Sequence, residues 1–340
     1  MLRLPTRRHV TAVLIAGTLL GCARTDDDTL IERIPSTARA EPLESTLEGL
    51  SAVTRAQSLD DPRVALGKEL FEDVRLSRDN TVSCRSCHLV NHGGADGLTT
   101  AVGIKGQVGP VNTPTVLNAA LNFAQFWDGR AATLEQQVPG PIHNPLEMGS
   151  DWDDVIAKLR ADTKFARPFM TVYPAGLNAA NVVDAIATYE RALVAVDSPF
   201  DRYLQGDTAA ISAQAERGYR AFLSLGCVSC HQGPNVGGNM YQRFGIMGDY
   251  FADRGHATDA DLGRFRVTGR ERDKYVFKVP SLRNVANTAP YFHDGSAATL
   301  EEAVNIMIKY QLGRTVSDDE RRNIVAFLKS LAGNVEDRLL

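Results

Sequence analysis

Apolar residues in this chain recur at helical spacing over several stretches, and helix-end signals flank them. The first helix is predicted to begin at Asp61-Pro62, because aspartate caps helix N-termini and proline fits the first helical position. Its apolar stripe consists of Val64, Leu66, Leu70 and Phe71. Residues 181–196 predict an amphipathic helix, and Ser198-Pro199 after it marks a boundary. No run of alternating residues predicts strands.

The second half of the chain repeats this plan. Ala215, Tyr219 and Phe222 form a helical stripe at a place that corresponds to the first helix. The last helix is predicted to begin with the capping box Ser317-x-x-Glu320 and to stop at Gly333. Its inward-facing residues are Ile324, Val325, Leu328 and Leu331.

An internal repeat supports the same division. Residues 114–138 align without gaps on residues 280–304. The matching pairs are Asn118 with Asn284, Phe126 with Phe292, Asp128-Gly129 with Asp294-Gly295, and 131–135 with 297–301. Each copy is predicted to enter a helix, with Thr133 or Thr299 as its N-cap. Two copies indicate a duplicated domain and not a solenoid.

Each half also carries one C-x-x-C-H motif. The motifs are Cys84, Cys87 and His88 in the first half, and Cys227, Cys230 and His231 in the second. This is the attachment pattern of c-type haem, in which two thiols bind the haem covalently and the histidine ligates the iron. A redox dithiol or a zinc site explains the pattern less well, since zinc pairs lie closer together and need no histidine directly after the second cysteine. The predicted fold is all-α, with two cytochrome c-like domains that each hold one covalently bound c-type haem.

Composition and charge agree with a globular protein. The chain has 340 residues, of which 44% are hydrophobic and 23% charged. Its formal net charge of -4 argues against nucleic acid and anionic membranes as partners.

The first residues resemble an export signal. Arg3, Arg7 and Arg8 precede an apolar run over 10–20 that is too short to span a bilayer, and Gly21-Cys22 follows. Residues 19–22 also resemble a lipobox, with Cys22 as the lipid-carrying residue; simple cleavage further on is the alternative. The protein is therefore predicted to be periplasmic, with a membrane tether if Cys22 is lipidated. The predicted segments are 1–22 (signal or lipoprotein peptide), 23–58 (tether), 59–198 (N-terminal haem domain) and 199–340 (C-terminal haem domain).

Several longer segments resemble the bacterial dihaem cytochrome c peroxidases, to which the MauG-type enzymes are related. These are GKELFEDVRLS, CRSCH, GPVNTPTVLNAALNFAQFWDGRA, NPLEMG, KYVFKVPSLRNVANTAPYFHDG and IMIKYQLG. The similarity runs from about residue 62 to residue 333 and includes both haem motifs in order. It implies a peroxidatic haem in the first domain and an electron-transfer haem in the second.

The resemblance implies that Met307 is the second ligand of the C-terminal haem iron. Met240 follows its haem motif too closely to reach the opposite face, and Met247 in a glycine-rich loop is a minor alternative. A haem with histidine and methionine ligands is closed to substrate and has a raised potential, so it relays electrons.

In the first domain the resemblance implies a general acid–base at Glu147, with Gln137 as a polar neighbour. His143 lies close by and is open to three interpretations: a second acid–base group, a ligand, or a solvent-exposed residue. The resemblance also places Trp127 between the haems as a step for electrons. It implies a calcium ion held by the Asn112 side chain and by the carbonyls of Thr288 and Pro290, which suits a cation that prefers oxygen ligands.

One position departs from the family pattern. Many members carry a histidine that caps the first iron until the other haem is reduced, and Ile104 stands at that place. His92, in the same loop, follows His88 too closely to reach the far face easily. The expected function is reduction of hydrogen peroxide to water with electrons from a small cytochrome c or a cupredoxin. MauG-like oxidation of a partner protein and plain electron carriage are the alternatives, and the oligomeric state, with a homodimer among the arrangements, is open.

Overall fold

The computed structural model describes residues 49–55 and 57–340. The predicted signal peptide, Cys22 and most of the predicted tether lie outside the described residues. No helix in the described part is long and apolar enough to cross a membrane.

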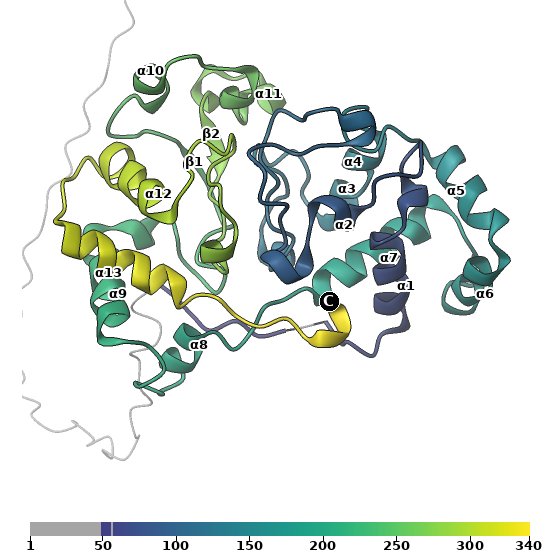
Figure 1. The fold of residues 1–340 in the computed structure, drawn as a ribbon, viewed down its shortest axis with the longest axis horizontal. Coiled ribbons are helices and arrows are strands. Elements are labelled where there is room, and N and C mark those ends of the chain that lie inside the picture. Colours follow the sequence, from purple (N-terminus) through teal and green to yellow (C-terminus); the bar gives the residue numbers. More distant parts are fainter. Residues whose placement is uncertain (1–48, 56) are drawn as a thin grey trace, which may run out of the picture. The chain divides into compact units, whose positions relative to one another are not determined.

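Helices make up nearly all of the regular secondary structure in the described residues (Figure 1). The α-helices of the first half are α1 (Pro62–Phe71), α2 (Cys84–Cys87), α3 (Leu134–Gln137), α4 (Pro139–His143), α5 (Trp152–Ala161), α6 (Thr163–Val172) and α7 (Ala179–Ala192). Those of the second half are α8 (Pro199–Leu204), α9 (Ala213–Leu225), α10 (Tyr250–Arg254), α11 (Phe265–Thr268), α12 (Leu300–Ile306) and α13 (Asp318–Lys329). Short 3-10 turns are η2 (Val74–Leu76), η3 (Val90–His92), η4 (Ile104–Gly106), η5 (Ala119–Leu121), η6 (Cys227–Ser229), η7 (Asp259–Leu262), η8 (Glu271–Asp273), η9 (Val285–Asn287) and η11 (Asp337–Leu339), and η10 (Met307–Gln311) is a π-helix.

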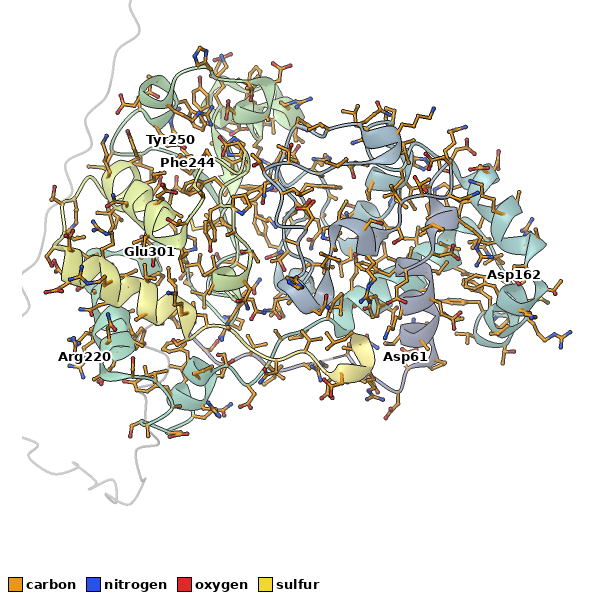
Figure 2. The ribbon with its side chains drawn as sticks, viewed as in Figure 1. Asp61, Asp162, Arg220, Phe244, Tyr250 and Glu301 are labelled. Carbon is orange, nitrogen blue, oxygen red and sulfur yellow. The ribbon has the colours of Figure 1, made fainter. Side chains whose placement is uncertain are left out.

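The helix starts predicted from the sequence are confirmed. The side chain of Asp61, labelled in Figure 2, accepts a hydrogen bond from the Arg63 N–H. Thr133 and Thr299 cap α3 and α12, and Ser317 forms the predicted capping box with Glu320. Such caps satisfy backbone donors at a helix start that have no partner within the helix.

Each domain contains one closely packed helix pair: α1 with α7, and α9 with α13 (Figure 1). A glycine sits at each crossing. A Cβ atom at Gly67 would lie 2.0 Å from the Ala185 carbonyl oxygen, and one at Gly218 would lie 1.8 Å from that of Asn323. Only glycine allows the backbones to approach this closely, and the same solution appears in both domains.

The internal repeat is confirmed in the backbone. Asn118 and Asn284 both adopt the left-handed conformation, with φ of 61° and 58°. The Asn118 side chain accepts from the Ala195 N–H and that of Asn284 from the Gly333 N–H, each at 2.8 Å. Each asparagine thus ties its repeat to the segment after the last helix of its own domain.

The two main apolar cores correspond to the two domains, and each core includes a leucine from a segment of the other half of the chain. Leu50, from the predicted tether, lies in the core of the second domain. Leu339, from the predicted C-terminal domain, lies in the core of the first, and its carbonyl accepts from the Tyr189 hydroxyl at 2.6 Å. Both leucines are about 2% exposed or less, so burial of their apolar surface explains why these segments cross over.

Three details differ from the prediction. The helix expected over residues 181–196 is α7, which begins at Ala179 and ends at Ala192. A two-stranded antiparallel pair is present, β1 (Tyr241–Arg243) with β2 (Val276–Lys278). The last helix ends at Lys329 and not at Gly333, because the chain turns after Ser330 and the Gly333 N–H reaches Asn284. Figure 2 shows Phe244 beside Tyr250 next to these strands, with ring centroids 4.6 Å apart.

Candidate haem-binding and catalytic sites

The first C-x-x-C-H motif opens onto a cavity of about 510 Å³. Cys84 and Cys87 are free thiols on its wall. The Nδ1–H of His88 donates to the Gly94 carbonyl at 3.2 Å, which leaves Nε2 as the nitrogen available for a metal. Burial lowers the pKa of His88 and favours the neutral imidazole that iron ligation requires.

Glu147 and Gln137 line this same cavity from different elements. The side-chain amide of Asn144 donates to Glu147 Oε1 at 2.6 Å and fixes the carboxyl group. Burial raises the pKa of Glu147, against a smaller opposing effect of the Asn144 hydrogen bond. A carboxyl group with a raised pKa keeps its proton to a higher pH than an ordinary glutamate does, which suits a group that must both take and give a proton.

Three residues considered in the sequence do not line the first cavity. His143 is exposed, its Nδ1 lies 3.2 Å from the Ser150 carbonyl, and its ring packs edge-on against Trp152. His92 is exposed at the end of η3. Ile104 is 4% exposed, and its side chain packs toward Gly149. Of the three interpretations of His143, this placement supports the solvent-exposed residue.

The second motif opens onto a cavity of about 290 Å³. Burial lowers the pKa of His231 to about 4, so its imidazole is neutral. Of the methionines in the described residues, only Met307 lines this cavity; Met247 is 62% exposed and packs on Gly313. Met307 begins the π-helix η10, and such widened turns often mark functional sites.

Trp127 lines both cavities. Its indole N–H donates to the Asn112 carbonyl at 2.9 Å, and the Asn112 N–H donates to the His293 carbonyl at 2.8 Å. The ring also packs against the aromatic cluster of the second half, which contains Phe277. These contacts hold the indole at one position between the two haem motifs.

The three residues matched to calcium lie at the wall of the second cavity. Asn112 is buried, and its side-chain N–H donates to the Leu98 carbonyl, so its Oδ1 remains as an acceptor. Within the described residues, no hydrogen bond to the carbonyl oxygens of Thr288 or Pro290 is formed. Three oxygens without donors are consistent with a hard cation.

Sequence reasoning missed two groups. Glu190 of α7 lines the first cavity, and the signal was available: it lies at i+4 from Ile186, on the buried stripe. The buried residues His293 and Asp261 form a cluster with the partly exposed Arg254, with 2.7 Å between His293 Nε2 and Asp261 Oδ1. No pattern in the sequence links these three, because they come from separate loops and helices.

The residues present fit c-type haem in both cavities. Each cavity combines two free thiols with a partly buried histidine whose pKa is lowered, and all of these groups lie at the cavity wall. The lining of each cavity exposes more apolar than polar surface, which suits a porphyrin. The first has an acid and an amide beyond its histidine, and the second has a thioether. The fold and the sites therefore define a dihaem protein of the c type.

Comparison with known proteins identifies the family. The family model for di-haem cytochrome c peroxidase matches residues 61–209, and the model for cytochrome c matches residues 215–332. The chain is 47% identical to the cytochrome c peroxidase Ccp of Escherichia coli over 84% of its own length, but it spans only 61% of that protein. It is 46% identical to the cytochrome c551 peroxidase of Nitrosomonas europaea, with 80% of both chains covered.

A crystal structure of a MauG-like protein associated with microbial copper homeostasis is similar in fold. Its TM-score is 0.74 at 28% identity, covering 85% of this chain and 95% of that one. The chain thus belongs to the bacterial dihaem cytochrome c peroxidase family, a class of oxidoreductases that act on peroxide. The predicted fold class and the predicted family are confirmed.

Proposed function

We propose that this protein reduces hydrogen peroxide to water in the first cavity, with electrons that enter at the second. The observation that carries the proposal is the partly buried carboxyl of Glu147 at the wall of the first cavity, held by the Asn144 amide. Bound haem supplies the iron that binds peroxide and passes electrons to it. Glu147 takes a proton from one peroxide oxygen and returns it to the other, which leaves as water. The overall reaction consumes one peroxide, two electrons and two protons and yields two waters.

The electron route follows from the contrast between the cavities. Met307 closes the second site to substrate, so that site exchanges electrons only. Trp127 lines both cavities and is the step between them. A small cytochrome c or a cupredoxin is the proposed donor, and the name of the Nitrosomonas europaea relative, cytochrome c551 peroxidase, favours the cytochrome.

MauG-like oxidation of a partner protein is the second candidate, favoured by the structural similarity to a MauG-like protein. That class differs by a tyrosine in place of the distal methionine, and Met307 counts against it. A plain electron carrier would have no use for Glu147. Steady-state turnover of peroxide with reduced cytochrome c distinguishes the peroxidase from both alternatives, because a carrier or a protein oxidase would leave the peroxide-dependent oxidation of cytochrome near background.

We predict that Met307→His lowers the midpoint potential of the second haem, because a thioether ligand favours the ferrous state and an imidazole does not. Both haems are expected to remain attached, and activity with the donor is expected to fall. Redox titration followed by absorbance measures the potential. Met247→His is the matched control and is expected to change nothing; a lowered potential in the control alone would assign the ligand to Met247.

The proposal includes one calcium ion at Asn112, Thr288 and Pro290. Asn112 carries both a side-chain ligand and the carbonyl that accepts from the Trp127 indole, so the ion would stabilise the position of that indole. Equilibrium dialysis of Asn112→Ala against wild type measures the ion directly. Equal calcium content in the two proteins would refute this site.

We also propose export to the periplasm, with Cys22 as a lipid anchor. The N-terminal pattern of basic, apolar and small residues supports this. Mass spectrometry of the mature protein distinguishes a lipidated Cys22 from simple cleavage beyond it.

A further inference from the structure

The first cavity contains a buried acidic residue, Glu190, that has no role in the proposed mechanism. Glu190 is 7% exposed and lines the first cavity from α7, whereas Glu147 lines it from the turn after α4. Its Oε2 is buried and has no hydrogen-bond partner among the described residues. A carboxyl group without a partner is costly to keep charged inside a protein.

Within the described residues no cation forms an ion pair with Glu190, although Arg130, Arg266 and Lys278 line other parts of the same cavity. Arg191, the next residue, pairs with Glu135 of α3, and Arg85 pairs with Glu72 at 2.6 Å. Lys68 of α1 donates to the Leu340 carbonyl. The charged and titratable groups on the elements around Glu190 are Arg63, Lys68 and Glu69 on α1, Cys84, Arg85, Cys87 and His88 at α2, Glu135 on α3, Glu147 after α4, and Asp184, Tyr189 and Arg191 on α7. None of these forms a hydrogen bond or an ion pair with Glu190 in the described structure.

From this geometry we infer that Glu190 is a redox-linked proton acceptor of the first haem site. When that site gains one electron from the donor protein, Glu190 takes up one proton from solvent and becomes a neutral carboxylic acid. When the site loses the electron, the proton returns to solvent. Glu190 acts on the haem through its charge and does not contact peroxide. The inference rests on the haem attachment that the proposed function assumes.

The physical basis is mutual electrostatics in a medium of low polarity. Burial raises the pKa of the Cys84 thiol, and the nearby charge of Glu190 raises it further. The carboxyl is therefore close to Cys84, the residue to which the haem would be attached. Burial already raises the pKa of Glu190 to about 8, so the proton is exchangeable near neutral pH. An added electron nearby raises this pKa further, and its removal lowers it.

The sign of the effect on potential follows. Glu190 has one pKa when the first haem is oxidised and a higher pKa when it is reduced. Below both pKa values Glu190 is neutral in either redox state, and the potential of the first haem is high and independent of pH. Between the two values one proton accompanies one electron, and the potential falls with rising pH by at most about 59 mV per unit. Above both values the carboxylate is charged in either state, and the potential is low and again constant.

The test is spectroelectrochemical titration of the first haem in the holoprotein from acid to alkaline pH. Glu190→Gln keeps the size of the side chain but cannot ionise, and we expect it to hold the potential at the high, acidic value throughout. Glu69→Gln removes an exposed glutamate from the same domain and is expected to retain the wild-type slope. A pH-dependent potential that persists unchanged in Glu190→Gln would overturn the inference.

Redox-difference infrared spectroscopy gives an independent readout. The wild type at a pH near 8 is expected to gain a protonated-carboxyl band on reduction, and Glu190→Gln is expected to lack it. If the band remains in the variant, another acid is responsible and the inference fails. Neither readout needs peroxide, so failure here is distinguishable from failure of the proposed peroxidase activity, which turnover of the wild type measures.

Discussion

Replacement of Glu147 by glutamine is expected to slow peroxide cleavage by about 10²–10⁴-fold, the usual contribution of a positioned acid–base group. The amide can still accept a hydrogen bond and fill the space, but it cannot carry a proton between the two peroxide oxygens. Stopped-flow absorbance separates binding from cleavage. We expect rapid binding in the variant, followed by slow cleavage, with both haems still attached.

The pH profile provides a second sign of the same role. Burial raises the pKa of Glu147, so the carboxylate that accepts the proton is lost at a higher pH than an ordinary glutamate would be. The value of kcat/KM is therefore expected to fall as the pH decreases through this raised pKa, and this limb is expected to vanish in Glu147→Gln.

His143→Gln is the control for Glu147→Gln. His143 lies only four residues away, but it is exposed and does not line the cavity, so its replacement is expected to leave cleavage unchanged. If His143→Gln slowed peroxide cleavage and Glu147→Gln cleaved peroxide at the wild-type rate, the acid–base role would belong to His143.

Features that depend on nearby residues were predictable from the sequence. The side chains of Asp61, Thr133 and Ser317 accept hydrogen bonds from N–H groups two or three residues later, so the residue types alone predict these helix starts. The haem motifs are equally local, since cysteines and histidine are consecutive or nearly so. The repeat is visible in part because a left-handed backbone favours asparagine, and both copies have one at the matching position, Asn118 and Asn284.

Features that depend on distant packing were not predictable in the same way. Leu50 and Leu339 belong to cores formed almost entirely by the other half of the chain, and a leucine carries no indication of its partner. The β1–β2 pair is only three residues long on each side, too short for an alternating pattern to appear. Glu190 continues a buried helix stripe, but whether such a stripe faces core or a cavity is decided by the opposite elements.

The oxidised protein is expected to react with peroxide without prior reduction. In many relatives a histidine caps the first iron, and reduction of the partner haem must release it. Ile104 at that place offers no ligand, is 4% exposed and packs toward Gly149. Its N–H donates to the Glu147 carbonyl at 2.8 Å, and a Cβ at Gly103 would lie 2.1 Å from the Leu146 carbonyl oxygen, so the loop is held against the Glu147 turn.

Electron paramagnetic resonance of the resting ferric protein tests this expectation, together with stopped-flow mixing of the oxidised protein with peroxide. We expect one high-spin signal from a five-coordinate first haem and one low-spin signal from the second, with immediate reaction. Ile104→Val keeps the packing and is expected to behave like the wild type. Ile104→His restores a ligand that can favour a capped state of the loop, so it is expected to gain low-spin character and to need reduction before it reacts. Two low-spin signals in the wild type, one of them from bis-histidine ligation, would contradict the expectation, because His92 or His143 would then have to leave its exposed position and reach the iron.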